Sequence, residues 1–215
     1  MQVKGIIFDL DGTLLDSMPA WEHVGHEFLC SQGIVPQVNV DELVKTFSFQ
    51  ECSDYFIREF GLTCTPDEVC DGITSIIWHC CHDEVPLKPY VREFLEQVHS
   101  NGIRLCIATA TSRALAECAL ERLGVWDYFE FLVTCDDVGA GKTDPLIYLS
   151  ACERLGTSVA DTVVFEDALH CAKTAKKAGF RVVAVHEDTL SEEDAKQIRL
   201  VADRYINDYQ ELLQQ

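Results

Sequence analysis

The chain has 215 residues, enough for one sizeable domain or for a domain that carries a smaller insertion. Its 36 acidic and 17 basic residues give a formal charge of −19, which argues against nucleic acid or an anionic membrane surface as a partner. No stretch has the length of a transmembrane span, and the first residues lack the apolar core and cleavage site of a signal peptide. We therefore expect a cytoplasmic protein.

The cysteines, 11 in number, are scattered and odd in count, which is typical of small buried side chains kept reduced, so we predict no disulfide. The segment HCCH, residues 79–82, has residue types that bind metals. Successive helical residues point about 100° apart, so four in a row cannot converge on one ion, although His79 and His82 can share a face. We favour a helix with two ordinary histidines over a metal site here.

The elements change in character along the chain. Residues 3–8 are predicted to form a strand, and three helical blocks bounded by glycine, proline or cap residues follow it, at 19–32, 41–60 and 66–83. From residue 86 helices and strands alternate. The helices are expected at 90–100, 112–124, from 144 with Asp144 as N-cap, and up to 179; the strands are expected at 103–108, 131–134, 162–165 and 182–185.

Strands separated by helices of this length require crossover connections, and these indicate a parallel sheet with helices on both faces. The all-helical segment interrupts that alternation directly after the first strand. We therefore predict an α/β fold with a doubly wound, Rossmann-like parallel sheet, made of residues 1–15 and 86–215, and an inserted helical cap made of residues 16–85.

Two carboxylates, Asp9 and Asp11, follow the first strand, and Gly12 allows the backbone to turn directly after them. The two aspartates are two residues apart, so they project to the same side of an extended chain. Glu166 and Asp167 follow a later strand and reach the same sheet edge, where open α/β sheets bind ligands. Acids gathered in this way repel one another unless a divalent cation holds them, so we predict Mg²⁺ there. Helix capping is the alternative use of each acid.

Cationic and hydroxyl side chains are expected at the same edge. Lys142 supplies a fixed positive charge. Thr109 and Thr111 follow the second strand, where a threonine hydroxyl can hold phosphate oxygens together with backbone N–H groups. A solvated loop lysine is the alternative for Lys142. The segment GAGKT at 139–143 is not a nucleotide P-loop, because the first glycine of that pattern would fall on Asp136.

These residues resemble the motifs of the haloacid dehalogenase superfamily. Its first motif, DxDx[TV] after a buried strand, stands here as DLDGT at residues 9–13. Its second motif matches Thr109, its third Lys142, and its fourth, an acidic pair, Glu166 and Asp167. The order of the motifs and the position of the cap resemble the branch (subfamily I) that contains β-phosphoglucomutase, phosphoglycolate phosphatase and many small-metabolite phosphatases. The resemblance covers essentially the whole chain.

What the resemblance implies is phosphoryl transfer through an aspartyl-phosphate. Asp9 would be the nucleophile, and Asp11 would protonate the leaving oxygen and then take a proton from the attacking water. Thr109, the Ala110 amide and Lys142 would stabilise charge on the transferring oxygens.

The resemblance also implies a metal site and a substrate-binding loop. Mg²⁺ would be bound by Asp9, the backbone carbonyl of Asp11 and Asp167, with Glu166 just behind them. The glycine and threonine that follow Asp11, at positions 12 and 13 (Gly12 and Thr13), would contribute to substrate binding. The superfamily often places proline after the motif lysine, whereas this chain has Thr143, so the loop shape differs there.

The cap must decide between phosphatase and mutase. In the mutase a cap arginine grips the second phosphate and a histidine assists near the acid/base; counted without gaps, Phe49 and Trp21 stand at those positions. Neither can take over the polar role, which favours a phosphatase acting on a small phosphomonoester such as a sugar phosphate or phosphoglycolate. Arg58 and His23 are the nearby substitutes if the count shifts. A sugar-phosphate mutase is the alternative, and a non-catalytic protein that keeps the fold is the third hypothesis.

Four cap aromatics are candidates for lining the substrate pocket or for packing the cap core: Trp21, Phe47, Phe49 and Tyr55. The partner we expect is a small phosphomonoester, and we expect a monomer or a weak dimer. A cap that shields an aspartyl-phosphate from water is expected to move during turnover.

Overall fold

The computed structural model describes residues 3–45, 47–79 and 84–213. Within these ranges a parallel sheet of six strands forms the centre, in the order β3-β2-β1-β4-β5-β6. The strands are β1 (Gly5–Phe8), β2 (Arg104–Thr109), β3 (Phe131–Thr134), β4 (Thr162–Glu166), β5 (Arg181–Val185) and β6 (Arg204–Ile206). This order is that of the doubly wound Rossmann-type sheet, so the predicted fold class is confirmed.

Strand β1 lies at the centre of the sheet, between β2 and β4. All four of its residues are buried, and its last residue, Phe8, pairs with Ile107 on one side and Phe165 on the other. The strands β2 and β3 lie on one side of β1, and β4, β5 and β6 lie on the other side. The carboxyl end of β1 is therefore the point where strand order reverses. Residues that follow β1, β2 and β4 therefore meet at one edge.

Helices cover both faces of the sheet, and each face has its own apolar core. On one face Phe8 and Phe94 meet Tyr209; on the other Ile7 packs in the cluster that holds Tyr148 and Phe180. The elements of these layers are α6 (Val91–Ser100), α7 (Arg113–Arg122), η2 (Trp126–Tyr128), α8 (Cys135–Val138), α9 (Leu146–Arg154), η3 (Val159–Asp161), α10 (Leu169–Lys177), α11 (Glu192–Val201) and α12 (Gln210–Leu213).

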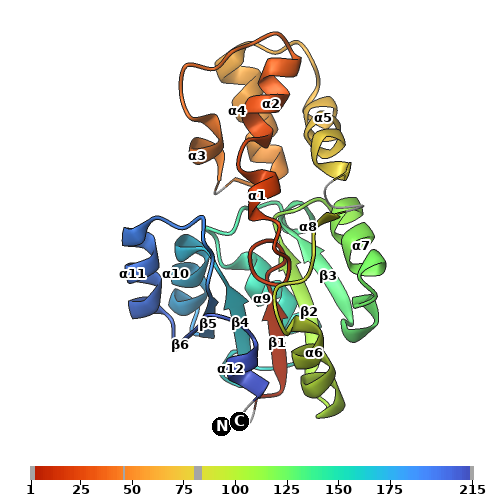
Figure 1. Cartoon of the computed structure of the whole chain (residues 1–215), viewed down its shortest axis with the longest axis vertical. Helices are drawn as coiled ribbons and strands as arrows, with labels where there is room; N and C mark the ends of the chain where they lie inside the picture. Colours follow the sequence, from red (N-terminus) through yellow and green to blue (C-terminus); the bar gives the residue numbers. More distant parts are fainter. Residues whose placement is uncertain (1–2, 46, 80–83, 214–215) are drawn as a thin grey trace.

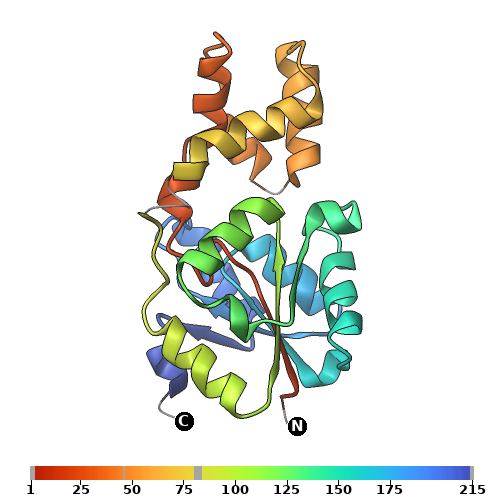
Figure 2. The same ribbon diagram turned by 90° about the vertical axis from the view of Figure 1, so that its right-hand side faces the viewer.

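In the described part of the segment between β1 and α6, five helices stand above the sheet, at the end of the molecule opposite to the termini (Figure 1). They are α1 (Met18–Trp21), α2 (Val24–Ser31), α3 (Val40–Val44), α4 (Phe49–Phe60) and α5 (Pro66–His79). They enclose a separate apolar core around Phe28, Leu29 and Phe56. Figure 2 shows α5 lying across the top of α7, so the helical group sits over the carboxyl edge of the sheet. We propose that this group is the cap, with the boundaries predicted from the sequence.

Two of the predicted helices are each divided in the structure. The block at 19–32 becomes α1 and α2, because the backbone of His23 leaves helical geometry, with φ −135° and ψ 9°. The block at 41–60 becomes α3 and α4, because Ser48 is extended and forms a capping box with Glu51. The S-x-x-E signal at 48–51 was present in the sequence and marks this start. The third block is described up to His79, and the remainder of HCCH lies outside the described residues.

The cap residues predicted for two core helices also differ in detail. Ser112 stands at the N-cap of α7, but its side chain makes no capping hydrogen bond. Helix α9 begins at Leu146 after Pro145, and Asp144 accepts the Leu146 N–H at 2.9 Å. Strand β6 completes the sheet. Neither this strand nor the helices α11 and α12 beside it in the chain were predicted from the sequence. Nine cysteines fall in the described ranges and all are free.

Candidate active site

Asp9 continues directly from β1, and its N–H donates to the carbonyl of Phe165 at 3.0 Å. This bond holds Asp9 at the sheet edge, where its side chain is buried. The ammonium of Lys142, only 4% exposed, forms an ion pair with the Asp9 carboxylate and a second one with Glu166 at 2.8 Å. The structure thus brings together Asp9, Lys142 and Glu166, which are far apart in the sequence.

Asp9, Glu166 and Asp167 form a cluster whose carboxylate oxygens lie within 4.8 Å of one another. All three side chains are buried, and one positive charge from Lys142 cannot neutralise them. Glu166 Oε2 is buried and has no hydrogen-bond partner among the described residues. A hard divalent cation with its bound water fits this donor set, since its ligands would be oxygens and its charge would offset the surplus. The Asp11 side chain is not part of this cluster.

The pKa shifts in the cluster also favour a bound cation. Burial, with the neighbouring charge of Glu166, raises the pKa of Asp9 well above its usual range, and Lys142 counteracts this. Burial and Glu166 also raise the pKa of Asp167 to about 7. Burial alone would lower the pKa of Lys142, but Asp9 and Glu166 raise it well above its ordinary value, so Lys142 stays charged. Full ionisation of the acids therefore calls for a further cation.

The predicted loop residues Gly12 and Thr13 lie against Asp167. Gly12 has φ +75°, and a Cβ added there would stand 2.4 Å from Asp167 Oδ2. Thr13 Oγ1 donates to Asp167 Oδ1 at 3.0 Å, and the carbonyl of Thr13 accepts from the hydroxyl of Tyr209 at 3.2 Å. Gly12 and Thr13 thus help to fix the position of the Asp167 side chain. The sequence indicated substrate binding for these two residues and did not indicate this role.

The residues after β2 have divided roles. Thr109 is almost fully buried, and its hydroxyl accepts the N–H of Thr111 at 3.0 Å, which shapes the turn after β2. Ala110 lies between them and is half-buried. Thr111, noted in the sequence only as a polar residue at a strand end, donates its hydroxyl to Asp11 Oδ2.

Asp11 receives donors from three described side chains. Besides Thr111, Ser17 Oγ donates to Asp11 Oδ1 at 2.6 Å, and the indole Nε1 of Trp21 donates to the same oxygen at 2.9 Å. Trp21 thus makes a polar contact that was not predicted from the sequence, because its ring nitrogen reaches the candidate acid/base. An indole N–H can only donate, so Trp21 cannot exchange a proton as histidine does.

Comparison with known proteins identifies the family. The model of the haloacid dehalogenase-like hydrolases matches residues 3–179. This chain belongs to that family.

A phosphorylated carbohydrates phosphatase of Thermotoga maritima is 29% identical over 177 residues, which cover 82% of each chain. The crystal structure of CbbY from Rhodobacter sphaeroides in complex with phosphate superposes with a TM-score of 0.83 at 25% identity, covering 98% of this chain and 96% of CbbY. A putative β-phosphoglucomutase of Thermotoga maritima gives a TM-score of 0.69 at 26% identity, covering 96% and 94%. These matches agree with the branch of the haloacid dehalogenase superfamily that the motifs indicated.

Aromatic residues of the cap pack against one another near the core. Trp21 and Phe49 form an edge-to-face pair with ring centroids 6.1 Å apart. Phe47 packs on Tyr55 at 5.9 Å, and Tyr55 packs further on Phe56 within the cap cluster. Trp21 therefore reaches the site, whereas Phe49 is buried in the cap core and Tyr55 packs against that core.

The two polar substitutes named for the mutase positions are engaged elsewhere. Arg58 is exposed, bonds Glu59 at 2.7 Å and lies over the Tyr55 ring at 5.8 Å. His23 stands at the N-cap of α2 and makes no capping bond there. Within the part of the chain that the structure describes, no hydrogen bond or ion pair joins either residue to the acid cluster.

Tyr148 is the site residue that sequence reasoning missed most completely. Its hydroxyl is buried and donates to Glu166 Oε1 at 2.7 Å, the same oxygen that accepts Lys142. Tyr148 sits in the apolar run of α9, and nothing local in the sequence marks it as polar in function. Ser17 was missed in the same way, although its place eight residues beyond the nucleophile position is within reach of Asp11.

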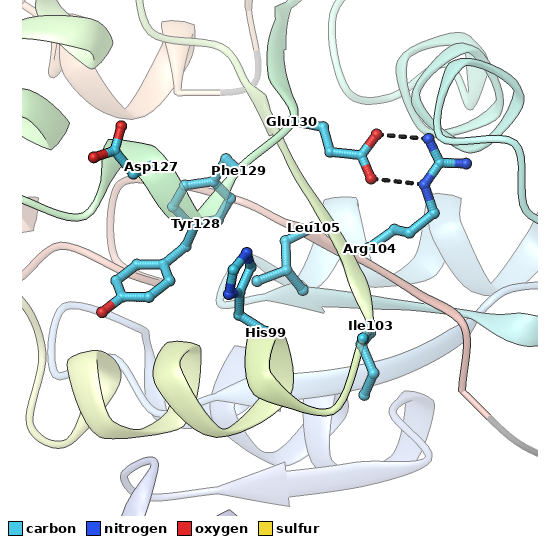
Figure 3. A pocket seen from close by; sticks show the side chains of 9 residues that line it. His99, Ile103, Arg104, Leu105, Asp127, Tyr128, Phe129 and Glu130 are labelled. Atoms are coloured by element: carbon cyan, nitrogen blue, oxygen red, sulfur yellow. Dashed lines mark hydrogen bonds and ion pairs between the residues drawn. The ribbon is translucent and has the colours of Figure 1, made fainter.

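A separate shallow pocket of about 250 Å³ lies near the amino ends of β2 and β3, away from these residues (Figure 3). Its wall includes the paired Arg104 and Glu130 and the ring of Tyr128. Arg104 and Glu130 pair with each other at 2.6 Å in this pocket. Across the described ranges, no helix combines the length and apolar character needed to cross a bilayer.

Proposed function

We propose that this chain is a Mg²⁺-dependent phosphatase that hydrolyses a small phosphomonoester, with sugar phosphates as first candidates, through a phosphoryl group carried by Asp9. The observation that supports this best is the buried ion pair between Asp9 and Lys142, set beside the carboxylates of Glu166 and Asp167. Lys142 favours the ionised, nucleophilic form of Asp9, and the remaining acids suit a bound cation.

In the first step a carboxylate oxygen of Asp9 attacks phosphorus, and the bond from phosphorus to the leaving oxygen breaks. Asp11 gives its proton to that oxygen, so the product leaves as an alcohol. Lys142, Thr109 and the Ala110 amide are the proposed partners of the transferring oxygens. Asp9 ends this step as an acyl phosphate.

In the second step Asp11, now a carboxylate, takes a proton from water, and the hydroxide that forms adds to phosphorus. The bond from phosphorus to Asp9 then breaks, which restores the Asp9 carboxylate and releases inorganic phosphate. The hydrogen bonds from Ser17, Trp21 and Thr111 suit the carboxylate form of Asp11 in this step, because all three side chains donate.

The residues that would hold Mg²⁺ are Asp9, Asp167 and the backbone carbonyl of Asp11, with Glu166 behind them. When bound, the ion supplies positive charge that offsets the charge of the phosphate oxygens. Thr13 and Gly12 keep Asp167 in place for this purpose, and Tyr148 with Lys142 orients Glu166.

The preference for a single phosphate rests on the cap. Phe49 stands where the mutase interpretation needs a cation, and it packs on Trp21 instead. Aromatic faces suit the carbon skeleton of a sugar or polyol better than they suit a second phosphate. The similarity to a phosphatase named for phosphorylated carbohydrates supports the same substrate class.

The test is release of inorganic phosphate from a panel of sugar phosphates, phosphoglycolate, nucleotides and p-nitrophenyl phosphate, with and without Mg²⁺. We expect Mg²⁺-dependent release from at least one sugar phosphate, lowered at least about a thousandfold in Asp9→Asn, which keeps the shape of the side chain but removes the nucleophile. The matched control is Asp161→Asn, directly before β4 at the end of the strand away from the acid cluster, where the side chain pairs with Lys4 at 2.8 Å; it should leave the rate unchanged.

Two outcomes would contradict the proposal. Faster isomerisation than hydrolysis of a sugar phosphate in the presence of its bisphosphate would favour the mutase. Failure to release phosphate from every compound, in a folded protein that still binds Mg²⁺, would favour a non-catalytic role for the fold.

A further inference from the structure

Trp21 connects the cap to the candidate acid/base. It is the last residue of α1, whereas Asp11 lies in the loop directly after β1. The indole Nε1 lies 2.9 Å from Asp11 Oδ1. A contact between an indole N–H and a catalytic carboxylate does more than fill space, because it fixes which oxygen accepts and where that oxygen points.

The indole ring is held from several sides. Phe49 of α4 meets it edge-to-face at 6.1 Å. The ring also packs against the small cluster of Ile77 and Leu115, and these two residues come from α5 of the cap and α7 of the core. Figure 2 shows that α5 and α7 lie next to each other at this junction. Trp21 thus packs at the junction between the cap helix α5 and the core helix α7.

The donors around Asp11 also distinguish its two oxygens. Oδ1 accepts from both Ser17 and Trp21, while Oδ2 accepts from Thr111. The indole cannot turn into an acceptor, but the hydroxyl of Thr111 can. The proton that Asp11 exchanges is therefore better placed on Oδ2, and Oδ1 stays an acceptor through both steps.

We propose that Trp21 is a positioning residue for Asp11, which locks Oδ1 and leaves Oδ2 to carry the proton when the cap rests on the core. This inference rests on the phosphatase function proposed above. It ties proton transfer to the closed arrangement of the cap, because opening the cap would withdraw the indole donor and release the Asp11 side chain.

The test uses Trp21→Phe, which keeps an aromatic ring beside Phe49 and removes the N–H together with the five-membered part of the indole ring. We compare kcat/KM for a sugar phosphate, whose alkoxide must be protonated, with that for p-nitrophenyl phosphate, whose phenolate leaves without a proton. We expect a loss of about tenfold or more on the sugar phosphate and less than about twofold on the aryl phosphate. The matched control, Trp126→Phe in the distant η2, should change neither value.

Equal losses on both substrates would overturn the proposal, because the ring would then act only through packing or binding. A double-mutant cycle adds a second criterion on the sugar phosphate. In an Asp11→Asn background Trp21→Phe should cause little further loss, whereas fully additive losses would show that Trp21 does not act through Asp11.

A readout without turnover separates this inference from the proposed function. The indole N–H of Trp21, assigned in an NMR spectrum from its disappearance in Trp21→Phe, should shift in Asp11→Ala, which removes the acceptor. An unmoved resonance would overturn the contact itself. If the resonance shifts but the wild type hydrolyses no phosphate, the contact stands, and the proposed function and the catalytic role of Trp21 are both overturned.

Discussion

The core edge and the cap contribute different kinds of side chain to the site. The core contributes buried charge: Lys142 pairs with Asp9 and Glu166, and the oxygens of Asp9, Glu166 and Asp167 lie within 4.8 Å of one another. The cap contributes aromatic surface, and its polar links to Asp11 are the indole N–H of Trp21 and the hydroxyl of Ser17. Charged groups buried together tolerate little change, whereas an aromatic cover can be exchanged more freely. We infer that the core determines the reaction and that the cap determines which substrate is accepted.

The largest expected effect comes from filling the space that the core edge leaves for Asp167. Gly12→Ala would place a methyl group 2.4 Å from Asp167 Oδ2 at a backbone with φ +75°. We expect activity to fall by about a hundredfold or more, because displacing Asp167, the carboxylate proposed to hold the metal, disturbs the geometry of the reaction. Steady-state kinetics and Mg²⁺ titration of the variant check this.

A control variant separates the effect of backbone strain at Gly12 from the effect of displacing Asp167. Gly102→Ala has a similar φ of +73°, but the added methyl group meets nothing within 4 Å. It should cost about 1 kcal/mol of unfolding free energy and leave activity intact. Equal losses of activity in both variants would contradict the role given to Gly12.

An intermediate effect concerns the pH dependence of the metal-free cluster. The pKa of Asp167 is about 7 in the folded protein against 3.8 for the ordinary group, so the folded chain holds a proton that the unfolded chain has lost. This contribution to stability is complete below pH 3.8 and is lost as the pH rises through about 7. Thermal unfolding without metal should show the decline, and Asp167→Asn should weaken it.

Mg²⁺ should reverse that decline, because the ion competes with the proton for the same oxygens. We expect saturating Mg²⁺ to raise the unfolding temperature more at about pH 8 than at about pH 6. The same increase at both values would show that Asp167 does not titrate in this range or does not bind the ion.

The smallest effect is expected in the cap, at the cation that the mutase interpretation would use. Arg58 is exposed and bonds Glu59, so Arg58→Ala should change kcat/KM by less than about twofold. Kinetics with a sugar monophosphate and with a sugar bisphosphate measure this. A loss above about tenfold restricted to the bisphosphate would instead make Arg58 a phosphate-binding residue and weaken the contrast between core and cap.

Much of the core could be read from local sequence. We predicted the apolar strand before Asp9 and the alternation of helices and strands after residue 86. We also predicted that Lys142 and Glu166 follow strands. The fold class and the family are confirmed. The division of the cap was less accessible, because the Ser48 capping box breaks a helical pattern that looks continuous in its apolar spacing.

By itself the sequence determined which chemical groups reach the carboxyl edge, because parallel strands bring their ends together whatever covers them. Only the tertiary structure decided how those groups are turned. Thr111 reaches Asp11 across 100 positions, Tyr148 reaches Glu166 from an apolar helix, and Trp21 reaches Asp11 from the cap. Such orientations depend on how helices pack on the sheet and on each other, and no local periodicity of the chain encodes that packing.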